Sequence, residues 1–196
     1  ELEKFMLHQV HDLNRKFHSY FSEYNFHKLY KELLNFCSQD LSAFYFDIRK
    51  DTLYCDEKKS LARKSCIQLL NILLDVLLRW FAPILSFTTE EIFKIIKKEE
   101  NDTIHLKYFP KLPKTWQNNK LFEKYSKLKS IRNVCNAGIE VKRTNKEVGS
   151  SLETDVEIYL SKNYFDLIQG FDLSEFCITS EAKAKSLDES NLKNLF

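Results

Sequence analysis

The 196-residue sequence has little glycine and little proline, with three residues of each. Such scarcity argues against a turn-dense all-β fold and favours long helices. The sequence also lacks a glycine-rich phosphate-binding loop, a paired-carboxylate motif and a nucleophile beside a recognisable base. We therefore predict no catalytic residues and expect the chain to bind a partner.

Cysteine is present but shows no paired spacing. The five cysteines are an odd number without a Cys-x-x-Cys pair, which disfavours a disulfide framework and fits a reducing, cytoplasmic compartment. His8 and His11 lie three residues apart, but no cysteine pair accompanies them, so we predict no metal site. The sequence opens at Glu1 within an amphipathic pattern and without a signal peptide, so we expect a piece of a longer protein.

Charge is polarised along the chain, although the net charge is only +2. From Lys107 to Lys146, eleven Lys or Arg residues accompany two acids, whereas from Glu147 onward ten acids accompany four lysines. A basic stretch next to an acidic one is typical of a protein with a polyanionic partner.

Apolar residues recur every three or four positions in five stretches, which predicts a mainly α fold. Short links between these stretches indicate a four-to-five-helix bundle with a small C-terminal α/β appendage. We expect Asn25 to cap the second helix, and Thr88 with Glu91 to form a capping box that opens the fourth. The expected helices cover residues 2–24, 26–50, 61–81, 88–100 and 117–142.

Two expectations concern the interior of this bundle. The aromatic block from Phe44 to Phe46 is expected to pack inside, and the second helix to end near Lys50. The third helix is apolar apart from one polar line, and we expect everything outside this line to be buried. Asp75 and Arg79 on that line would each cost about 2.5–3.5 kcal/mol in a bilayer, so a bundle helix is favoured over a membrane span.

The C-terminal part shows the alternation of strands. Glu153 to Leu160 predicts a half-buried strand, followed by a short helix at 164–168 and a second strand at Phe176 to Thr179. The polar end is expected to be frayed. The predicted regions are a helical bundle at 1–113, a basic helix with a small α/β subdomain at 114–182, and a polar tail at 183–196.

The stretch from Asp40 to Asp56 carries a packed block and, at its end, polar side chains that are expected to lie in water. Unpaired RNA bases stack on aromatic side chains, while Lys and Arg neutralise phosphates. Two alternatives stay open: Tyr54 packs while Arg49 pairs with an acid, and the lysines form an ordinary solvated face. The candidate binding residues are Arg49, Lys50, Asp51 and Tyr54 in this stretch, Lys120, Lys124, Lys127 and Arg132 on an outward face of the last helix, and Lys142, Arg143 and Lys146 at its end.

Three blocks of the sequence resemble the anticodon-binding region of class I isoleucyl-tRNA synthetases. The first block is Asn35-Phe36-Cys37 together with Asp40 to Asp56, the second is Leu78 to Ile92, and the third is Val148 to Glu153. The third block is similar to the Gly-x-Ser-Leu-Glu element of bacterial-type members. The resemblance extends over nearly the whole chain, from about Leu2 to about Ser180.

The resemblance implies that the bundle is of the class I synthetase anticodon-binding type. It also implies that the bundle binds the anticodon stem-loop of an isoleucine-accepting tRNA. A separate catalytic domain of the parent ligase would use ATP and Mg. We expect this fragment to be non-catalytic and without a cofactor of its own. We also expect it to be a cytoplasmic monomer that does not contact a membrane. Lys50 and Asp51 match the family's Lys-Asp element, whereas Thr52 stands where an Arg is common. The alternatives are the anticodon-binding domain of a related valyl, leucyl or methionyl enzyme, and a helical protein-interaction module.

Overall fold

The structure is a computed structural model of the 196-residue chain and describes residues 1–97 and 101–187. It divides into two compact units, one of residues 1–118 and one that begins at Asn119. The first unit is helical, and the second combines helices with a two-stranded sheet. The predicted mainly α fold with a small α/β appendage is confirmed.

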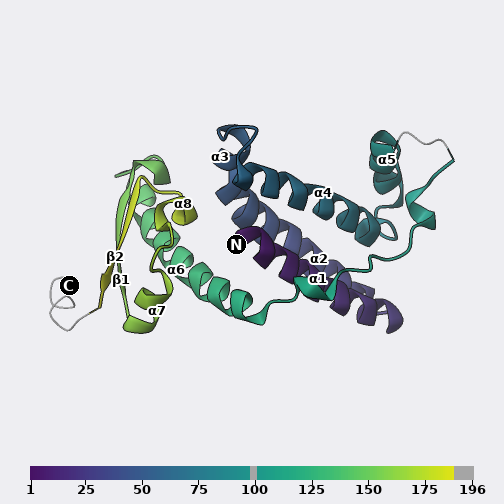
Figure 1. The fold of residues 1–196 in the computed structure, drawn as a ribbon, viewed down its shortest axis with the longest axis horizontal. Coiled ribbons are helices and arrows are strands. Elements are labelled where there is room, and N and C mark those ends of the chain that lie inside the picture. The colour runs from purple at the N-terminus through teal and green to yellow at the C-terminus, as the bar shows by residue number, and fades with distance from the viewer. Residues whose placement is uncertain (98–100, 188–196) are drawn as a thin grey trace. The chain divides into compact units, whose positions relative to one another are not determined.

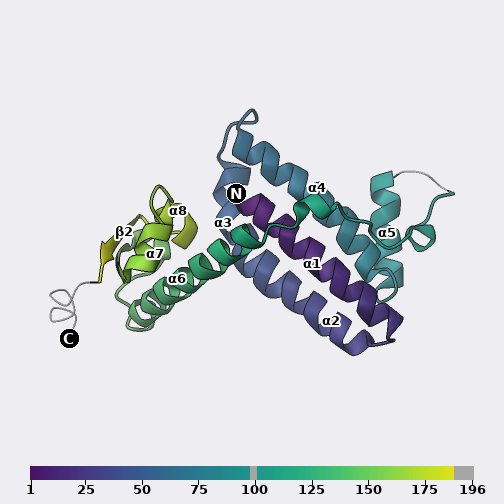
Figure 2. The ribbon, with the colours of Figure 1, turned by 60° about the horizontal axis from the view of Figure 1, so that its bottom comes forward.

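The first unit is a bundle in which α1 is central (Figures 1 and 2). α1 packs against both α2 and α4 and lies between them in Figure 2. The segment of residues 101–118 that follows α5 is called the crossover below. It contains single turns of 3-10 helix at Ile104–Leu106 and Lys114–Trp116. The helices are α1 (Leu2–Ser22), α2 (Phe26–Asn35), α3 (Asp47–Tyr54), α4 (Leu61–Phe81) and α5 (Ser86–Lys97), with a π-helical segment (Phe36–Phe46) between α2 and α3.

Local sequence determines where several of these helices begin and end. The Asn25 side chain accepts a hydrogen bond from a backbone amide of the first turn and caps α2, as predicted. α4 ends two residues before Pro83, which cannot continue a helix. The capping box predicted at Thr88 is wrong, because α5 already begins at Ser86. Residues 98–100, where this helix was expected to end, lie outside the described residues.

The second predicted helix is longer than expected. Helical structure continues from α2 through the π-helical segment to Tyr54, instead of ending near Lys50. Ile48 and Thr52 lie four residues apart and are both buried, so the helical period persists where the sequence was expected to break it. The prediction that Phe46 packs inside is also wrong, since this side chain is 40% exposed.

The most apolar helix, α4, is only partly covered within its unit. Its polar line faces outward as predicted, and Asp75 accepts a hydrogen bond from Arg79 at 2.9 Å. Ile67 and Leu74 are 42% and 39% exposed, which corrects the expectation that all apolar side chains of this helix are buried. Within residues 1–97 and 101–187, none of the helices combines the length and the hydrophobicity that a bilayer-spanning segment needs.

Trp80 of α4 lies at the centre of the first unit's core. Its ring is fully buried and makes edge-to-face contacts with Phe17 and Phe36, at centroid distances of 4.8 and 6.2 Å. The indole Nε1 donates to Asn14 Oδ1 at 3.0 Å, and Asn14 Nδ2 donates to the Pro110 carbonyl at 2.9 Å. One buried side chain therefore joins α1, α4 and the π-helical segment and, through Asn14, the crossover.

His8 attaches the end of the crossover to α1. The Asn118 backbone N–H donates to His8 Nδ1 at 2.8 Å, which requires this nitrogen to be unprotonated. Nε2 lies 3.4 Å from Asp12 Oδ2. Burial lowers the pKa of His8 below its ordinary value of 6.5, an effect that Asp12 opposes and His11 increases.

The free energy of unfolding should therefore depend on pH through His8. Because folding favours the neutral imidazole, stability is expected to be greatest above pH 6.5 and to fall as the pH drops below that value, until the pH reaches the folded-state pKa. Urea denaturation between about pH 7.5 and about pH 5.5 measures the effect, because carboxylates with ordinary pKa values stay ionised there. His8→Gln keeps an acceptor for the Asn118 N–H and should flatten this dependence. The same pH dependence in His8→Gln would contradict the assignment.

The second unit combines a long helix, two short helices and a parallel sheet (Figure 1). α8 packs on α6, and α7 contacts both strands. The strands pair in register from Asp155 with Glu181 to Leu160 with Ser186. The elements are α6 (Asn119–Thr144), β1 (Asp155–Leu160), α7 (Lys162–Leu167), α8 (Leu173–Cys177) and β2 (Glu181–Ser186). On α6, Val134 is 69% exposed, whereas the buried apolar residues are Leu121, Tyr125, Leu128, Ile131, Cys135 and Ile139.

The second strand lies further along the chain than predicted. The expected strand at Phe176 to Thr179 is instead the end of α8 and a left-handed turn at Ile178, with φ of 58°. β2 follows, so residues 183–186 of the predicted polar tail belong to the sheet. Alternating Ala and Lys has a weak strand propensity by itself, and pairing with β1 stabilises the strand. Residues 188–196 of that predicted tail lie outside the described residues.

Candidate nucleic-acid interface

The end of α3 exposes three of the predicted residues together. Lys50 and Tyr54 lie four residues apart on one side of the helix, and Asp51 lies next to them. All three are exposed, Tyr54 by 81%. Ile48 and Thr52 are buried and hold the opposite side of α3 against the bundle. This group, Lys50, Asp51 and Tyr54, is called the α3 tip below.

Arg49 does not belong to the α3 tip. Its Nε donates to Glu3 Oε1 at 2.7 Å, and the two side chains are only 13% and 14% exposed. The expectation that Arg49 lies in water is wrong, because this ion pair joins α3 to the start of α1. The alternative that Arg49 pairs with an acid is confirmed, whereas the alternative that Tyr54 packs is wrong.

Asp56 orders the loop that follows the α3 tip. Its Oδ2 accepts from the Ser60 hydroxyl at 2.8 Å, and its carbonyl accepts from Arg63 Nη1 at 2.8 Å. Lys58 and Lys59 are exposed in this loop and are missing from the predicted set. Two adjacent lysines shortly after an aromatic candidate are the signal that would have found them.

The basic face predicted on α6 is narrower than the sequence suggests. Lys120 and Lys127 are exposed. Lys124 is half-buried, and its Nζ lies 5.8 Å from the centre of the Phe171 ring, a cation–π arrangement. We call Lys120, Lys124 and Lys127 the α6 lysine face, in which the first and last are the more accessible.

Arg132 is a structural residue. Its side chain is only 4% exposed, and its guanidinium donates to the Phe176 carbonyl and lies 6.0 Å from the centre of the Phe176 ring. The prediction that Arg132 faces outward is wrong, because its guanidinium is buried in the second unit and donates to a carbonyl of α8. Arg132 thus attaches α8 to α6.

The three cations at the end of α6 interact with their own helix terminus. Lys142 Nζ lies 2.6 Å from Glu147 Oε2, and this ion pair holds the pKa of Glu147 below its ordinary value. Arg143 pairs with Glu140. Lys146 adopts a left-handed conformation, with φ of 59°, and its N–H donates to the Arg143 carbonyl at 2.9 Å, an arrangement that ends helices. All three stay exposed, so these contacts leave them within reach of a ligand.

These surfaces have the chemistry of binding sites. The α3 tip offers an aromatic ring, an ammonium group and a carboxylate, the groups that contact unpaired bases. The α6 lysine face offers ammonium groups that neutralise phosphates. In the part of the chain that the structure describes, no group of three His, Cys, Asp or Glu side chains is placed to hold a metal ion. The arrangement therefore favours an anionic ligand that carries accessible bases.

Comparison with known proteins identifies the class. The family model described as the anticodon-binding domain of tRNA ligase matches residues 3–158. The chain therefore belongs to the family of anticodon-binding domains of tRNA ligases.

Within that class, the chain is similar to isoleucine-tRNA ligases, which confirms the resemblance found in the sequence. It is 58% identical over 182 residues to the isoleucine-tRNA ligase of Pelagibacter ubique (strain HTCC1062), covering 93% of this chain and 20% of that protein. The enzyme of Agrobacterium fabrum is 39% identical over 181 residues, covering 92% and 19%. That of Rhodopseudomonas palustris is 38% identical over 187 residues, covering 95% and 19%. The chain thus spans about a fifth of the length of these curated relatives.

Proposed function

We propose that this chain binds the anticodon stem-loop of an isoleucine-accepting tRNA. The observation that carries the proposal is the α3 tip, where Lys50, Asp51 and Tyr54 are exposed at the end of a packed helix in a chain of the anticodon-binding family. The names of the relatives support isoleucine as the amino acid that the tRNA accepts.

The two surfaces have different roles in this proposal. Lys120 and Lys127 neutralise phosphates, which contributes affinity without sequence information. At the α3 tip, Tyr54 stacks on an unpaired base, Lys50 contacts a base acceptor or a phosphate, and Asp51 accepts from a base N–H group. Specificity therefore comes from the α3 tip, and much of the affinity comes from the α6 lysine face.

We also infer that the longer protein is an isoleucine-tRNA ligase that uses ATP and Mg and acts in the cytoplasm as a monomer. The relatives carry that enzyme name. In this proposal the bundle of residues 1–113 binds the anticodon and takes no part in the chemistry of aminoacylation. Residues 114–182 contribute phosphate contacts, with Lys142, Arg143 and Lys146 as further contributors beside the α6 lysine face.

Substitutions at the α3 tip test the proposal. Tyr54→Ala is expected to weaken binding of isoleucine tRNA about tenfold, since stacking of one base is worth about 1–3 kcal/mol. Lys50→Ala is expected to weaken it by a similar factor, since a hydrogen bond from a charged group is worth about 1.5–3 kcal/mol. A tRNA with another anticodon should lose less affinity, so discrimination between the two tRNAs decreases. Filter binding of both tRNAs at one salt concentration measures this difference.

Tyr108→Ala is the matched control, because Tyr108 is 86% exposed in the same unit but lies outside the α3 tip. It should bind both tRNAs as the unmodified chain does. Equal weakening of the two tRNAs by Tyr54→Ala and Lys50→Ala would remove the specificity role, and unchanged binding would remove the α3 tip from the interface.

A further inference from the structure

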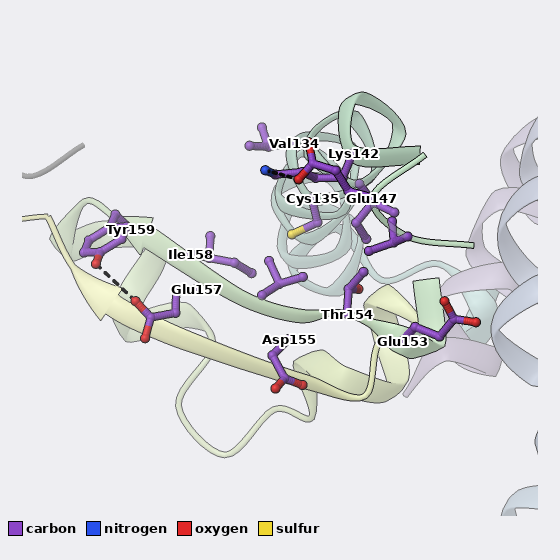
Figure 3. Close-up of a pocket in the computed structure, with 14 residues that line it drawn as sticks. Val134, Cys135, Lys142, Glu147, Glu153, Thr154, Asp155, Glu157, Ile158 and Tyr159 are labelled. Atoms are coloured by element: carbon purple, nitrogen blue, oxygen red, sulfur yellow. Dashed lines mark hydrogen bonds and ion pairs between the residues drawn. The ribbon is translucent and has the colours of Figure 1, made fainter. Parts of the chain in front are cut away.

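A groove in the second unit is lined by none of the residues of the α6 lysine face. It has a volume of about 600 Å³ and is bounded by α6 and β1 (Figure 3). α6 contributes Val134 and Gly138, among others, and β1 contributes every residue from Asp155 to Tyr159. Val134 is 69% exposed, so an apolar side chain on the wall of this groove is left open to a ligand.

The groove follows one edge of β1. Successive side chains of a strand point to opposite faces, so contact with every residue from Asp155 to Tyr159 brings the backbone of β1 to the wall of the groove. β2 pairs with β1 on one side, and no other strand of the described residues pairs with it. An unpaired edge presents backbone donors and acceptors in a row, which an extended peptide can match.

The side chains along this edge specify what an added strand must carry. Figure 3 shows Ile158 on the side of β1 that faces α6, whereas Asp155 and Glu157 point away from α6. An added strand would therefore meet Val134, Gly138 and Ile158 on one face and carboxylates on the other. Small apolar side chains suit the first face and basic side chains suit the second, because cross-strand neighbours of opposite charge stabilise pairing.

β2 already meets the same requirement on its own side of β1. Ala182 and Ala184 stand in register with Val156 and Ile158. On the other face, Lys185 Nζ lies 2.7 Å from Glu157 Oε1. A peptide of similar alternation would repeat this pairing at the open edge.

We propose that the groove binds an extended peptide segment with alternating small apolar and basic side chains, which pairs as a strand with the open edge of β1. The groove is lined by four acids, Glu147, Glu153, Asp155 and Glu157, and by one lysine, Lys142, which pairs with Glu147, so its excess of negative charge favours a basic peptide. The second unit would then bind a peptide through residues other than those of the α6 lysine face.

A synthetic peptide tests the proposal directly. The probe is acetylated and amidated Val-Lys-Val-Lys-Val-Lys, titrated into the nitrogen-15-labelled 196-residue chain while amide resonances are recorded. We expect saturable shifts of the β1 amides and about tenfold weaker binding of the matched peptide Val-Glu-Val-Glu-Val-Glu. A lysine peptide N-methylated at alternate residues should lose binding, because it cannot donate to β1.

Gly138→Leu fills the groove without disturbing the helix. A Cβ at Gly138 meets no atom within 4 Å, and leucine has the higher helix propensity, so this variant should fold normally and bind the lysine peptide about tenfold more weakly. Asn136→Leu, at an exposed position of α6 outside the groove, is the matched control and should bind normally. Asp155→Lys should shift the preference toward the glutamate peptide.

Four outcomes would overturn the proposal. The first two are that the lysine peptide binds no more tightly than the glutamate peptide, and that Gly138→Leu binds the lysine peptide as tightly as the unmodified chain does. The third is that the resonance shifts are confined to residues away from β1. The fourth is that the chain self-associates through the edge of β1, which would make a second copy the occupant.

Discussion

Lys120→Glu combined with Lys127→Glu is expected to weaken tRNA binding about 100-fold at about 50 mM salt. Each lysine that neutralises a phosphate releases counterions. Losing two contacts should therefore make the negative slope of log affinity against log salt shallower by about 1.5. Both side chains are exposed on α6, so the fold should be unaffected. Gel-shift titrations at several salt concentrations measure both quantities.

A matched double variant distinguishes the effect of lost phosphate contacts on tRNA affinity from the effect of the changed net charge. Lys31→Glu with Lys162→Glu changes the charge by the same amount, at exposed positions outside the proposed surfaces. Its affinity should fall far less, because charges distant from the RNA are screened by salt. If both double variants lose the same affinity, net charge explains the effect, and an unchanged salt slope in the first variant would exclude the α6 lysine face from the interface.

Trp80→Ala is expected to lower the free energy of unfolding of the first unit by about 4 kcal/mol. The substitution empties the centre of the core and removes the ring contacts with Phe17 and Phe36. It also leaves Asn14 Oδ1 buried without its indole donor, which adds a cost beyond the cavity. Urea denaturation followed by circular dichroism measures the loss, which would be a large part of the stability of an ordinary domain.

Two further variants divide that effect into packing and hydrogen bonding. Trp80→Phe keeps most of the apolar volume and removes the donor to Asn14, so we expect a loss of about 1–3 kcal/mol. Trp116→Ala removes the other tryptophan, which is only partly buried on a 3-10 turn, and should cost less than Trp80→Ala. A loss from Trp80→Ala no larger than that from Trp116→Ala would contradict the central role of Trp80.

The helices are where sequence and structure agree best, because burial of one face requires apolar residues at helical spacing. Asn25 caps α2 as predicted, since a side-chain cap is a contact between residues close in sequence. Thr52 shows the limit of this reading. The sequence predicts a helix end near Lys50, yet the bundle buries Thr52 and α3 continues to Tyr54.

For the candidate site, too, the sequence predicted some positions correctly and others wrongly. Lys50, Asp51 and Tyr54 are exposed, as expected of polar or amphipathic side chains at a helix end. Arg49 and Arg132 have the same chemistry as the exposed cations but are held inside. Their partners, Glu3 and Phe176, lie 46 and 44 residues away in the sequence, so no local pattern points to them.

By itself, the sequence determined that this chain is a helical member of the anticodon-binding family, because helical periodicity and family motifs are properties of neighbouring residues. Only the tertiary structure decided which cations reach solvent, and only it placed β2 on one edge of β1, with no strand on the other edge among the residues that the structure describes. These outcomes depend on which distant residues meet, and that is decided by packing rather than by any one segment.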